Sequence, residues 1–249
     1  MSEQRFDGKV AWITGGANGF GAGTARRLAG LGATVVVSDI DAANGELVAK
    51  EVGGTFLPCD VTSYDANVET VRRIVDEQGK LDIAFLNAGI ATAMGIGADF
   101  DAARYRQAMG VNLDGVAYGM HAAVTAMTGR GGQIVATASL AGLTATAFDP
   151  IYGANKHAVV GLVRALGEVY KPDGIRIHAL CPSFAYTNII KGSEQSLLDM
   201  GFPILDVADV VAAFQNILDA DSTGEAWYVV AGRPSEPFQF RRAPGPRLD

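Results

Sequence analysis

The chain contains few cysteines and few histidines, and both shortages limit what it can be. Its 249 residues include only 2 cysteines, Cys59 and Cys181. Two thiols are too few for a disulfide framework and too isolated for a metal site, so we expect both to be buried and free. The 3 histidines, His121, His157 and His178, are dispersed and lack the spacing of zinc ligands. We therefore predict no metal site.

Positive charge and long apolar runs are also scarce. The 20 Lys and Arg residues are outnumbered by 27 Asp and Glu residues, which gives a formal net charge of -7. Binding to nucleic acid requires clustered basic side chains, so this balance argues against it. The longest uncharged apolar stretch, 134–148, is too short to span a membrane, and the N-terminus lacks the apolar region of a signal peptide. We expect a cytoplasmic protein that binds neither nucleic acid nor membrane.

Short apolar runs rich in β-branched residues alternate with segments of helix length. The runs that we predict to be strands are 10–14, 34–38, 55–58, 83–86, 133–137, 175–180 and 226–230. Strands separated by helices form right-handed crossovers and a parallel sheet that is covered on both faces. The pattern predicts an α/β fold: one Rossmann-type domain over residues 1–249, with a doubly wound parallel sheet of about seven strands.

Two segments depart from this alternation. Residues 183–206 mix glycine, proline and apolar residues without a clear period. Because ligands bind at the carboxyl ends of the strands in such sheets, we interpret this segment as a substrate lid. An ordinary crossover loop with a short helix is the alternative. The tail, 232–249, is rich in Pro and Arg, and we expect it to be irregular or to form a subunit contact.

A glycine-rich loop directly follows the first predicted strand and opens a helix. Glycines allow the backbone to approach a pyrophosphate, and the helix N-terminus supplies free N–H groups and a positive dipole end. The residues of this loop that we expect to contact a dinucleotide are Gly15, Asn18, Gly19, Phe20 and Gly21.

Asp39 ends the second predicted strand, about twenty residues after the glycine loop. A carboxylate at this place can accept hydrogen bonds from the adenosine ribose, and it repels the 2′-phosphate of NADP. The glycine loop and the residues just after Asp39 contain no Lys or Arg that would offset this repulsion. The sequence therefore favours NAD as the cofactor.

Tyr152 and Lys156 are four residues apart in a predicted helix, which puts both on one face. Ser139 ends the fifth predicted strand. Oxidation of an alcohol requires a base, and lowering the pKa of a tyrosine from about 10 to near neutrality requires about 4 kcal/mol. A lysine charge about 4 Å away in an effective dielectric of 20 supplies about that much. We expect Lys156 to lower the pKa of Tyr152, although the spacing could also arise by chance.

Over nearly its whole length the chain resembles the short-chain dehydrogenase/reductase family. The matching motifs, in the family's order, are TGxxxGxG at 14–21, the adenine-contacting pair Asp60 and Val61, the NAG motif Asn87, Ala88 and Gly89, and the catalytic tetrad Asn112, Ser139, Tyr152 and Lys156. The resemblance implies that Ser139 orients the substrate oxygen and that Tyr152 exchanges the proton. It also implies that Lys156 holds the nicotinamide ribose and that Asn112 supports a water relay.

The segment from Pro182 to Thr187 resembles the family's PGxxxT motif, which implies that both residues contact the cofactor. Ser183 replaces the usual glycine. This would strain the backbone if the φ angle there were positive. Residues 152–190 are most similar to NAD-dependent hydroxyprostaglandin and hydroxysteroid dehydrogenases, which implies a bulky apolar alcohol.

We therefore expect an NAD-dependent oxidation of a bulky, apolar secondary alcohol, such as a steroid, aryl or alkyl alcohol. The residues expected to bind it are Ser139, Leu143, Phe148 and Tyr186. Two alternatives stay open: a ketoreductase that works in the opposite direction, and a catalytically silent NAD-binding sensor. The family resemblance also implies a homotetramer, because the helices after the fourth and fifth strands pair across two-fold axes.

Overall fold

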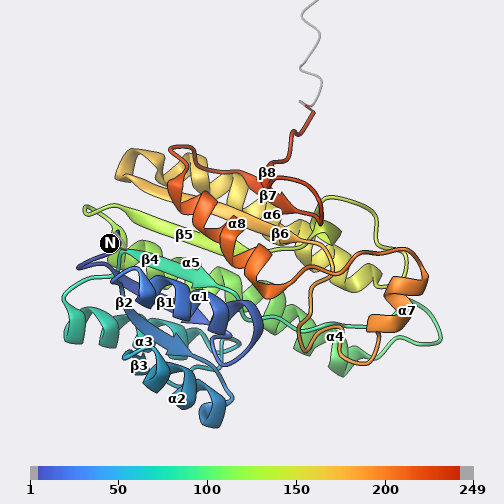
Figure 1. The fold of residues 1–249 in the computed structure, drawn as a ribbon, viewed down its shortest axis with the longest axis horizontal. Helices are drawn as coiled ribbons and strands as arrows, with labels where there is room; N and C mark the ends of the chain where they lie inside the picture. Colours follow the sequence, from blue (N-terminus) through green and yellow to red (C-terminus); the bar gives the residue numbers. More distant parts are fainter. Residues whose placement is uncertain (1–4, 242–249) are drawn as a thin grey trace, which may run out of the picture.

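The computed structural model describes residues 5–241, and its centre is one sheet of eight strands (Figure 1). The strands follow the order β3-β2-β1-β4-β5-β6-β7-β8; the first seven are parallel and β8 is antiparallel to β7. Their bounds are β1 Val10–Thr14, β2 Thr34–Ser38, β3 Thr55–Phe56, β4 Ile83–Leu86, β5 Gly132–Thr137, β6 Ile175–Pro182, β7 Ala226–Val229 and β8 Glu236–Pro237. The predicted doubly wound α/β fold is confirmed.

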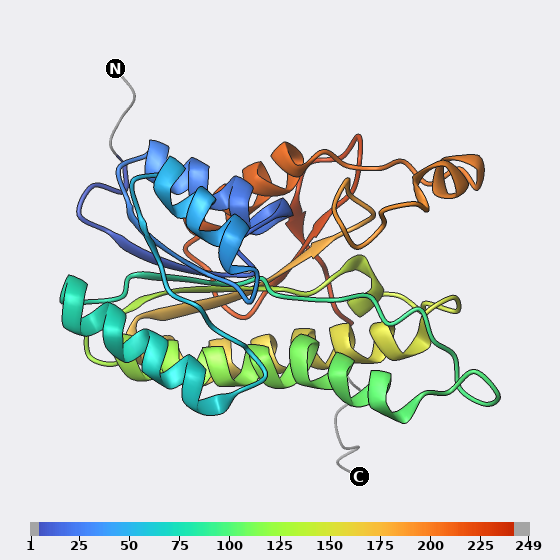
Figure 2. The same ribbon diagram turned by 90° about the horizontal axis from the view of Figure 1, so that it is seen from below.

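Helices cover both faces of the sheet (Figure 2). One layer contains α1, α2 and α8, and the opposite layer contains α3, α5 and α6. The helix bounds are α1 Gly19–Gly30, α2 Ala42–Glu51, α3 Tyr64–Gln78, α4 Ala102–Met109, α5 Gly115–Met127, α6 Pro150–Tyr170, α7 Glu194–Asp199 and α8 Val207–Asp219. Among residues 5–241, no helix combines the length and the apolar character needed to cross a membrane.

Each strand contributes side chains to two separate cores, which explains why the strands are apolar without alternation. In β1, Trp12 packs into the core under α3, α5 and α6, whereas Ile13 packs into the core under α1, α2 and α8. Trp12 is fully buried, and its Nε1 donates a hydrogen bond to Ser38 Oγ over 3.0 Å. The buried indole nitrogen therefore has a hydrogen-bond partner. A shifted register of β1 would bury this nitrogen without one, which favours the observed position of the strand.

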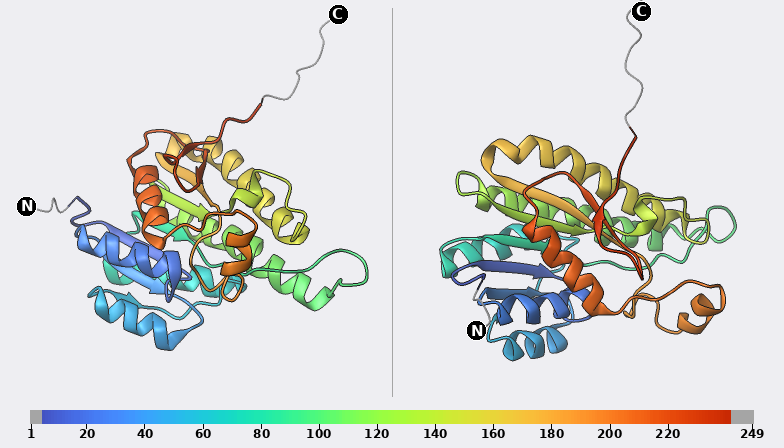
Figure 3. Two further views of the ribbon diagram at one scale, coloured as in Figure 1. Left: turned by 45° about the vertical axis from the view of Figure 1, so that its right-hand side comes forward. Right: turned by 45° about the horizontal axis from the view of Figure 1, so that its top comes forward.

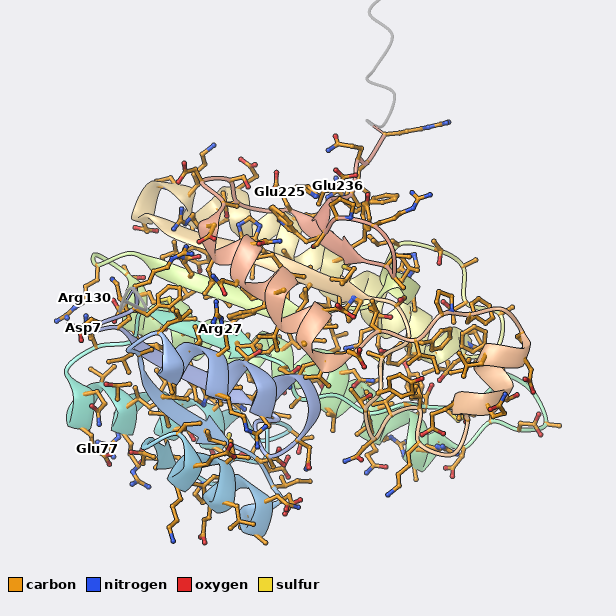
Figure 4. All side chains as sticks on the ribbon, in the orientation of Figure 1. Asp7, Arg27, Glu77, Arg130, Glu225 and Glu236 are labelled. Atoms are coloured by element: carbon orange, nitrogen blue, oxygen red, sulfur yellow. The ribbon has the colours of Figure 1, made fainter. Side chains whose placement is uncertain are left out.

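The strand order reverses next to β1, which pairs with β2 on one side and with β4 on the other. The connections that leave the carboxyl ends of β1 and β4 go to opposite faces of the sheet, and this is where ligands bind in open α/β sheets (Figure 2). The loops that follow these strands lie on the same side of the molecule as α4 and α7 (Figure 1). Asp7 and Arg130, which precede β1 and β5, lie at the opposite end of the sheet (Figure 4).

The segment 183–206 leaves the sheet after β6 and projects beyond it as a loop that carries α7 (Figure 3). Its two ends pair through a short parallel bridge between Ala185 and Leu205. Leu205 N donates to Phe184 O over 2.8 Å, and Tyr186 N donates to Leu205 O over 3.0 Å. The bridge fixes both ends of the excursion, so motion of its outer part would leave the sheet undisturbed.

The described part of the tail contains one short strand in an otherwise irregular segment. Glu236 and Pro237 form β8, which pairs with Tyr228 and Trp227 of β7. The tail continues past Phe240, whose ring lies 3.9 Å from the Arg164 guanidinium. Its last part, 242–249, lies outside the described residues.

Candidate active site

The glycine loop forms a tight turn between β1 and α1. Gly15 and Gly19 have φ angles of +61° and +52°, which side-chain-bearing residues rarely adopt. A Cβ atom on Gly15 would lie 2.8 Å from Ala88 Cα, and one on Gly21 would lie 2.2 Å from Gly15 O. Asn18 precedes α1 and makes no capping bond with its side chain, so the first N–H groups of the helix are left for a ligand. This cradle fits the pyrophosphate of a dinucleotide.

Asn87 joins the ends of three neighbouring strands. Its Nδ2 donates to Thr14 O and Gly15 O over 3.2 and 3.1 Å, and its Oδ1 accepts from Thr137 Oγ1 over 3.1 Å. The backbone N–H groups of Asn87 and Ala88 donate to Thr14 Oγ1. The Asn87 side chain is therefore used to shape the floor of the site. Sequence reasoning included Thr14 in the glycine motif without giving it a role, and it missed Thr137. The available signal for both was a polar side chain at the end of a buried strand.

Asp39 lies beside the glycine loop at the carboxyl end of β2. One carboxylate oxygen accepts from Ala17 N and the other from Asp41 N, each over 3.0 Å. A carboxylate can accept about four hydrogen bonds, so acceptor positions remain for a ribose. At the same edge of the sheet, Asp60 is exposed and Val61 is buried.

Three residues of the expected tetrad come together between β5 and α6. Ser139 follows β5, and its Oγ accepts from Ala141 N over 3.1 Å and donates to Pro182 O over 3.4 Å; the same hydroxyl acts on Tyr152 and opposes the rise of its pKa. Lys156 lies one turn further along α6, with its Nζ 5.5 Å from the centre of the Tyr152 ring. This Nζ donates to Thr137 O over 2.7 Å, and the side chain is almost completely buried.

Asn112 lies in a π-helical turn, Gly110–Asp114, between α4 and α5. Such turns are rare and are frequent at functional sites. Its Oδ1 accepts from Ile90 N and its Nδ2 donates to Ile90 O, both over 2.9 Å, and Nδ2 also approaches Asn155 Oδ1 at 3.3 Å. A Cβ atom on Gly89 would lie 3.4 Å from Asn112 Oδ1 and 3.6 Å from Lys156 Nζ. All four expected catalytic residues therefore surround one place.

Burial shifts the pKa values of Tyr152 and Lys156 in opposite directions. Burial raises the pKa of Tyr152 to about 12, and the charge on Asp149 adds to this, whereas the bond from Ser139 opposes it. Burial lowers the pKa of Lys156 to about 8. Lys156 is not among the groups that shift the Tyr152 pKa in the chain by itself, and the lowering expected in the cofactor complex stays a prediction. The physical reason is that the ammonium lies over the ring and bonds to Thr137 O, while burial disfavours the phenolate.

The end of β6 brings Pro182 and Thr187 to the same edge. A Cβ atom on Gly19 would lie 3.4 Å from Thr187 Cγ2, so the start of segment 183–206 touches the glycine loop. Ser183 has no positive φ, because Ala93 is the single non-glycine residue with one among residues 5–241. The serine in the place of the usual glycine is therefore free of backbone strain.

The expected substrate residues lie in different surroundings. Leu143 packs against the core under α6, whereas Phe148 and Tyr186 are exposed. The Phe148 ring lies 5.9 Å from that of Phe184, which lies 5.3 Å from that of Phe202. This aromatic row joins the loop before α6 to segment 183–206. Sequence reasoning missed Phe184, although its place between Pro182 and Thr187 was a signal.

Comparison with known proteins agrees with this geometry. A family model described as short chain dehydrogenase matches residues 9–197. The chain is 36% identical over 221 residues to the short-chain dehydrogenase reductase ATA1 of Arabidopsis thaliana, covering 87% of this chain and 81% of that protein. It is 37% identical over 194 residues to a mitochondrial borneol dehydrogenase of Lavandula x intermedia, covering 77% and 74%.

A solved structure gives the same result for the fold. The crystal structure of levodione reductase superposes with a TM-score of 0.85 at 26% identity, covering 92% of this chain and 98% of that one. Together, the family model, the relatives and the arrangement of the glycine loop with Asn112, Ser139, Tyr152 and Lys156 show that the chain belongs to the short-chain dehydrogenase/reductase family of oxidoreductases, whose members typically bind NAD or NADP.

Proposed function

We propose that the protein is an NAD-dependent dehydrogenase that oxidises a secondary alcohol. The observation that carries this proposal is the convergence of Ser139, Tyr152, Lys156 and Asn112 beside the glycine loop. The fit of the glycine loop to a pyrophosphate and the position of Asp39 support a dinucleotide there. Bound NAD would supply the oxidised nicotinamide ring, which accepts the hydride and carries a positive charge.

The chain's own residues hold the substrate oxygen and move its proton. Ser139 donates a hydrogen bond to the oxygen of the substrate, and Tyr152 takes the hydroxyl proton when it acts as the base. Lys156 would hold the nicotinamide ribose, and Asn112 would support the water that connects Lys156 to solvent. The choice of NAD over NADP is supported by the fixed Asp39 carboxylate, which would face a 2′-phosphate.

One observation favours the opposite direction as a second candidate. A Tyr152 pKa of about 12 means that the chain's own groups keep the hydroxyl protonated near neutral pH, which is the form that donates a proton to a ketone. The named relatives do not decide the direction either, since one is a dehydrogenase and one a reductase. We keep oxidation as the main proposal because Asp39 favours NAD.

A bulky, apolar substrate is supported by the side chains at the entrance. Phe148, Phe184 and Phe202 form an aromatic row that includes the loop before α6 and the proposed lid, and Met200 is exposed on the same segment. Exposed apolar patches of this kind mark binding sites. The relative named for borneol is consistent with an apolar alcohol.

We also propose that the protein is a cytoplasmic homotetramer. An apolar groove of about 420 Å³ lies between α4 and α6, and its walls include Ile96 and Phe100, which are exposed. A second copy of the chain would cover these side chains. The two free, buried cysteines are consistent with a reducing compartment.

A screen of secondary alcohols with NAD, read by the absorbance of reduced nicotinamide, tests the proposal. Tyr152→Phe should lose at least about a hundredfold in rate while NAD binding stays nearly unchanged, since only the proton-exchanging hydroxyl is removed. Tyr170→Phe, at the far end of the same helix, is the matched control. If Tyr152→Phe keeps more than about a hundredth of the rate, another group is the base. NAD binding without turnover of any alcohol or ketone would favour the silent sensor.

A further inference from the structure

Asp149 is a buried carboxylate directly before the helix that carries Tyr152, and it is 7% exposed. One of its oxygens accepts hydrogen bonds from Thr92 Oγ1 and from Tyr152 N, the latter over 3.2 Å. The other accepts from Thr92 N over 3.2 Å and from Ala93 N over 2.7 Å. The same carboxylate therefore binds the first turn of α6 and a segment 56 to 57 residues away.

The bound segment is held in an unusual conformation. Ala93 has a φ angle of +45° and is the single non-glycine residue with a positive φ among residues 5–241. A residue with a Cβ adopts this conformation only where its surroundings hold it there. The two hydrogen bonds to the neighbouring N–H groups of Thr92 and Ala93 supply that restraint. Thr92 itself is fully buried.

This segment is continuous with the cofactor side of the site. It follows Asn87, which shapes the floor, and Ile90, which holds both amide atoms of Asn112. Asp149 thus joins the element that positions Asn112 to the element that carries Tyr152. A displacement of about 1 Å at such a place can reduce a rate by about a hundredfold.

We propose that Asp149 is a positioning residue that fixes the Tyr152 hydroxyl relative to the loop after β4, through Thr92 and Ala93. This inference rests on the proposed function, in which Tyr152 exchanges the proton.

An ordinary helix cap would look different. Asp101 caps α4, is exposed, and accepts only from Ala103 N and Arg104 N in the first turn of its own helix. Asp149 receives three of its four hydrogen bonds from the distant loop. Because most of its hydrogen-bond donors come from a segment distant in the sequence, Asp149 does more than cap the start of α6.

The charge on Asp149 should also affect the pH dependence of the reaction, which a purely structural residue would leave unchanged. The groups that face Tyr152 are Ser139 from the loop after β5, Cys181 from β6, and Lys156 and Asp149 from its own helix region. Burial makes the largest contribution to the raised pKa of Tyr152, and Asp149 raises it further. Removing this charge should lower the pKa of Tyr152, so alcohol oxidation should begin at a lower pH.

Three variants separate the hydrogen bonds from the charge. Thr92→Val removes the hydroxyl bond and keeps the charge, so kcat should fall about 10- to 100-fold with an unchanged pH profile and little change in the KM for NAD. Asp149→Asn should lower kcat and also shift the profile to lower pH. Asp101→Asn is the matched control and should leave kcat and the pH profile at wild-type values.

Amide hydrogen exchange of segment 87–95 gives a measurement that does not depend on activity. Exchange should be faster in Thr92→Val and Asp149→Asn than in the wild type and Asp101→Asn. Wild-type kcat and pH profile in both Thr92→Val and Asp149→Asn would overturn the proposal, as would unchanged exchange in both. If the wild type turned over no alcohol or ketone, the proposed function would be wrong, and the exchange rates would still decide whether Asp149 holds the loop.

Discussion

Replacement of Asp39 by asparagine should change the cofactor preference of the enzyme. The Asp39 carboxylate is oriented by the N–H groups of Ala17 and Asp41, each at 3.0 Å. An asparagine side chain at this position would keep the volume and one acceptor oxygen, and it would lose the negative charge. The substitution therefore tests the charge more than the shape of the site.

Two effects determine the expected magnitude. A hydrogen bond to a charged group contributes about 1.5–3 kcal/mol, so weaker bonds to the ribose should raise the Kd for NAD about tenfold or more. Two like charges about 4 Å apart repel by about 4 kcal/mol at an effective dielectric of 20. Asp39 is only half-buried, so solvent should reduce this to about 1–2 kcal/mol for NADP. The ratio of NAD affinity to NADP affinity should fall about a hundredfold in total.

Fluorescence titration of both reduced cofactors measures this ratio directly. Asp41→Asn is the control, because this carboxylate lies two residues away and accepts from Asn44 N and Nδ2 in its own helix. That variant should keep the wild-type preference. An unchanged ratio in Asp39→Asn, or an equal change in Asp41→Asn, would refute the placement of Asp39 at the ribose.

Three further predictions concern the buried lysine, the aromatic row and assembly. Because the pKa of Lys156 falls to about 8 on folding, the unfolded chain holds a proton that the folded chain lacks between pH 8 and about 10.5. The contribution of Lys156 to the free energy of unfolding should rise with pH in that window by up to about 3 kcal/mol, whereas the raised pKa values of the buried Cys59 and Cys181 thiols act in the opposite sense. In urea unfolding at pH 7 and 9.5, the change in stability should therefore be more favourable in the wild type than in Lys156→Met; an equal change in both proteins would contradict the prediction. Phe184→Ala should raise the KM for bulky aryl alcohols about tenfold and leave that for small alcohols nearly unchanged, whereas equal changes for both would argue against the aromatic row as a substrate wall. Light scattering at micromolar concentration should give four times the 26.0 kDa chain mass, and a monomeric mass would rule out the tetramer.

The features that sequence reasoning predicted well depend on short stretches of chain. The glycine loop follows β1 directly, and Asp39 directly follows β2, so one crossover brings them to the same edge. Tyr152 and Lys156 share a helix face because they are four residues apart. Local periodicity likewise predicted seven of the eight strands, while β8, with two residues in a proline-rich tail, carries too little pattern to be detected.

Other features depended on which distant segments pack together. The sequence indicated that Lys156 would assist Tyr152, but only the structure reveals that burial raises the pKa of the tyrosine to about 12. Nothing near Asp149 in the sequence indicates that Thr92 and Ala93, 56 to 57 residues away, donate to it. The motifs therefore determined the family and indicated the groups that we propose to react. Burial and long-range hydrogen bonds determined the protonation and the alignment of those groups, because both depend on neighbours that the fold supplies and that local sequence does not encode.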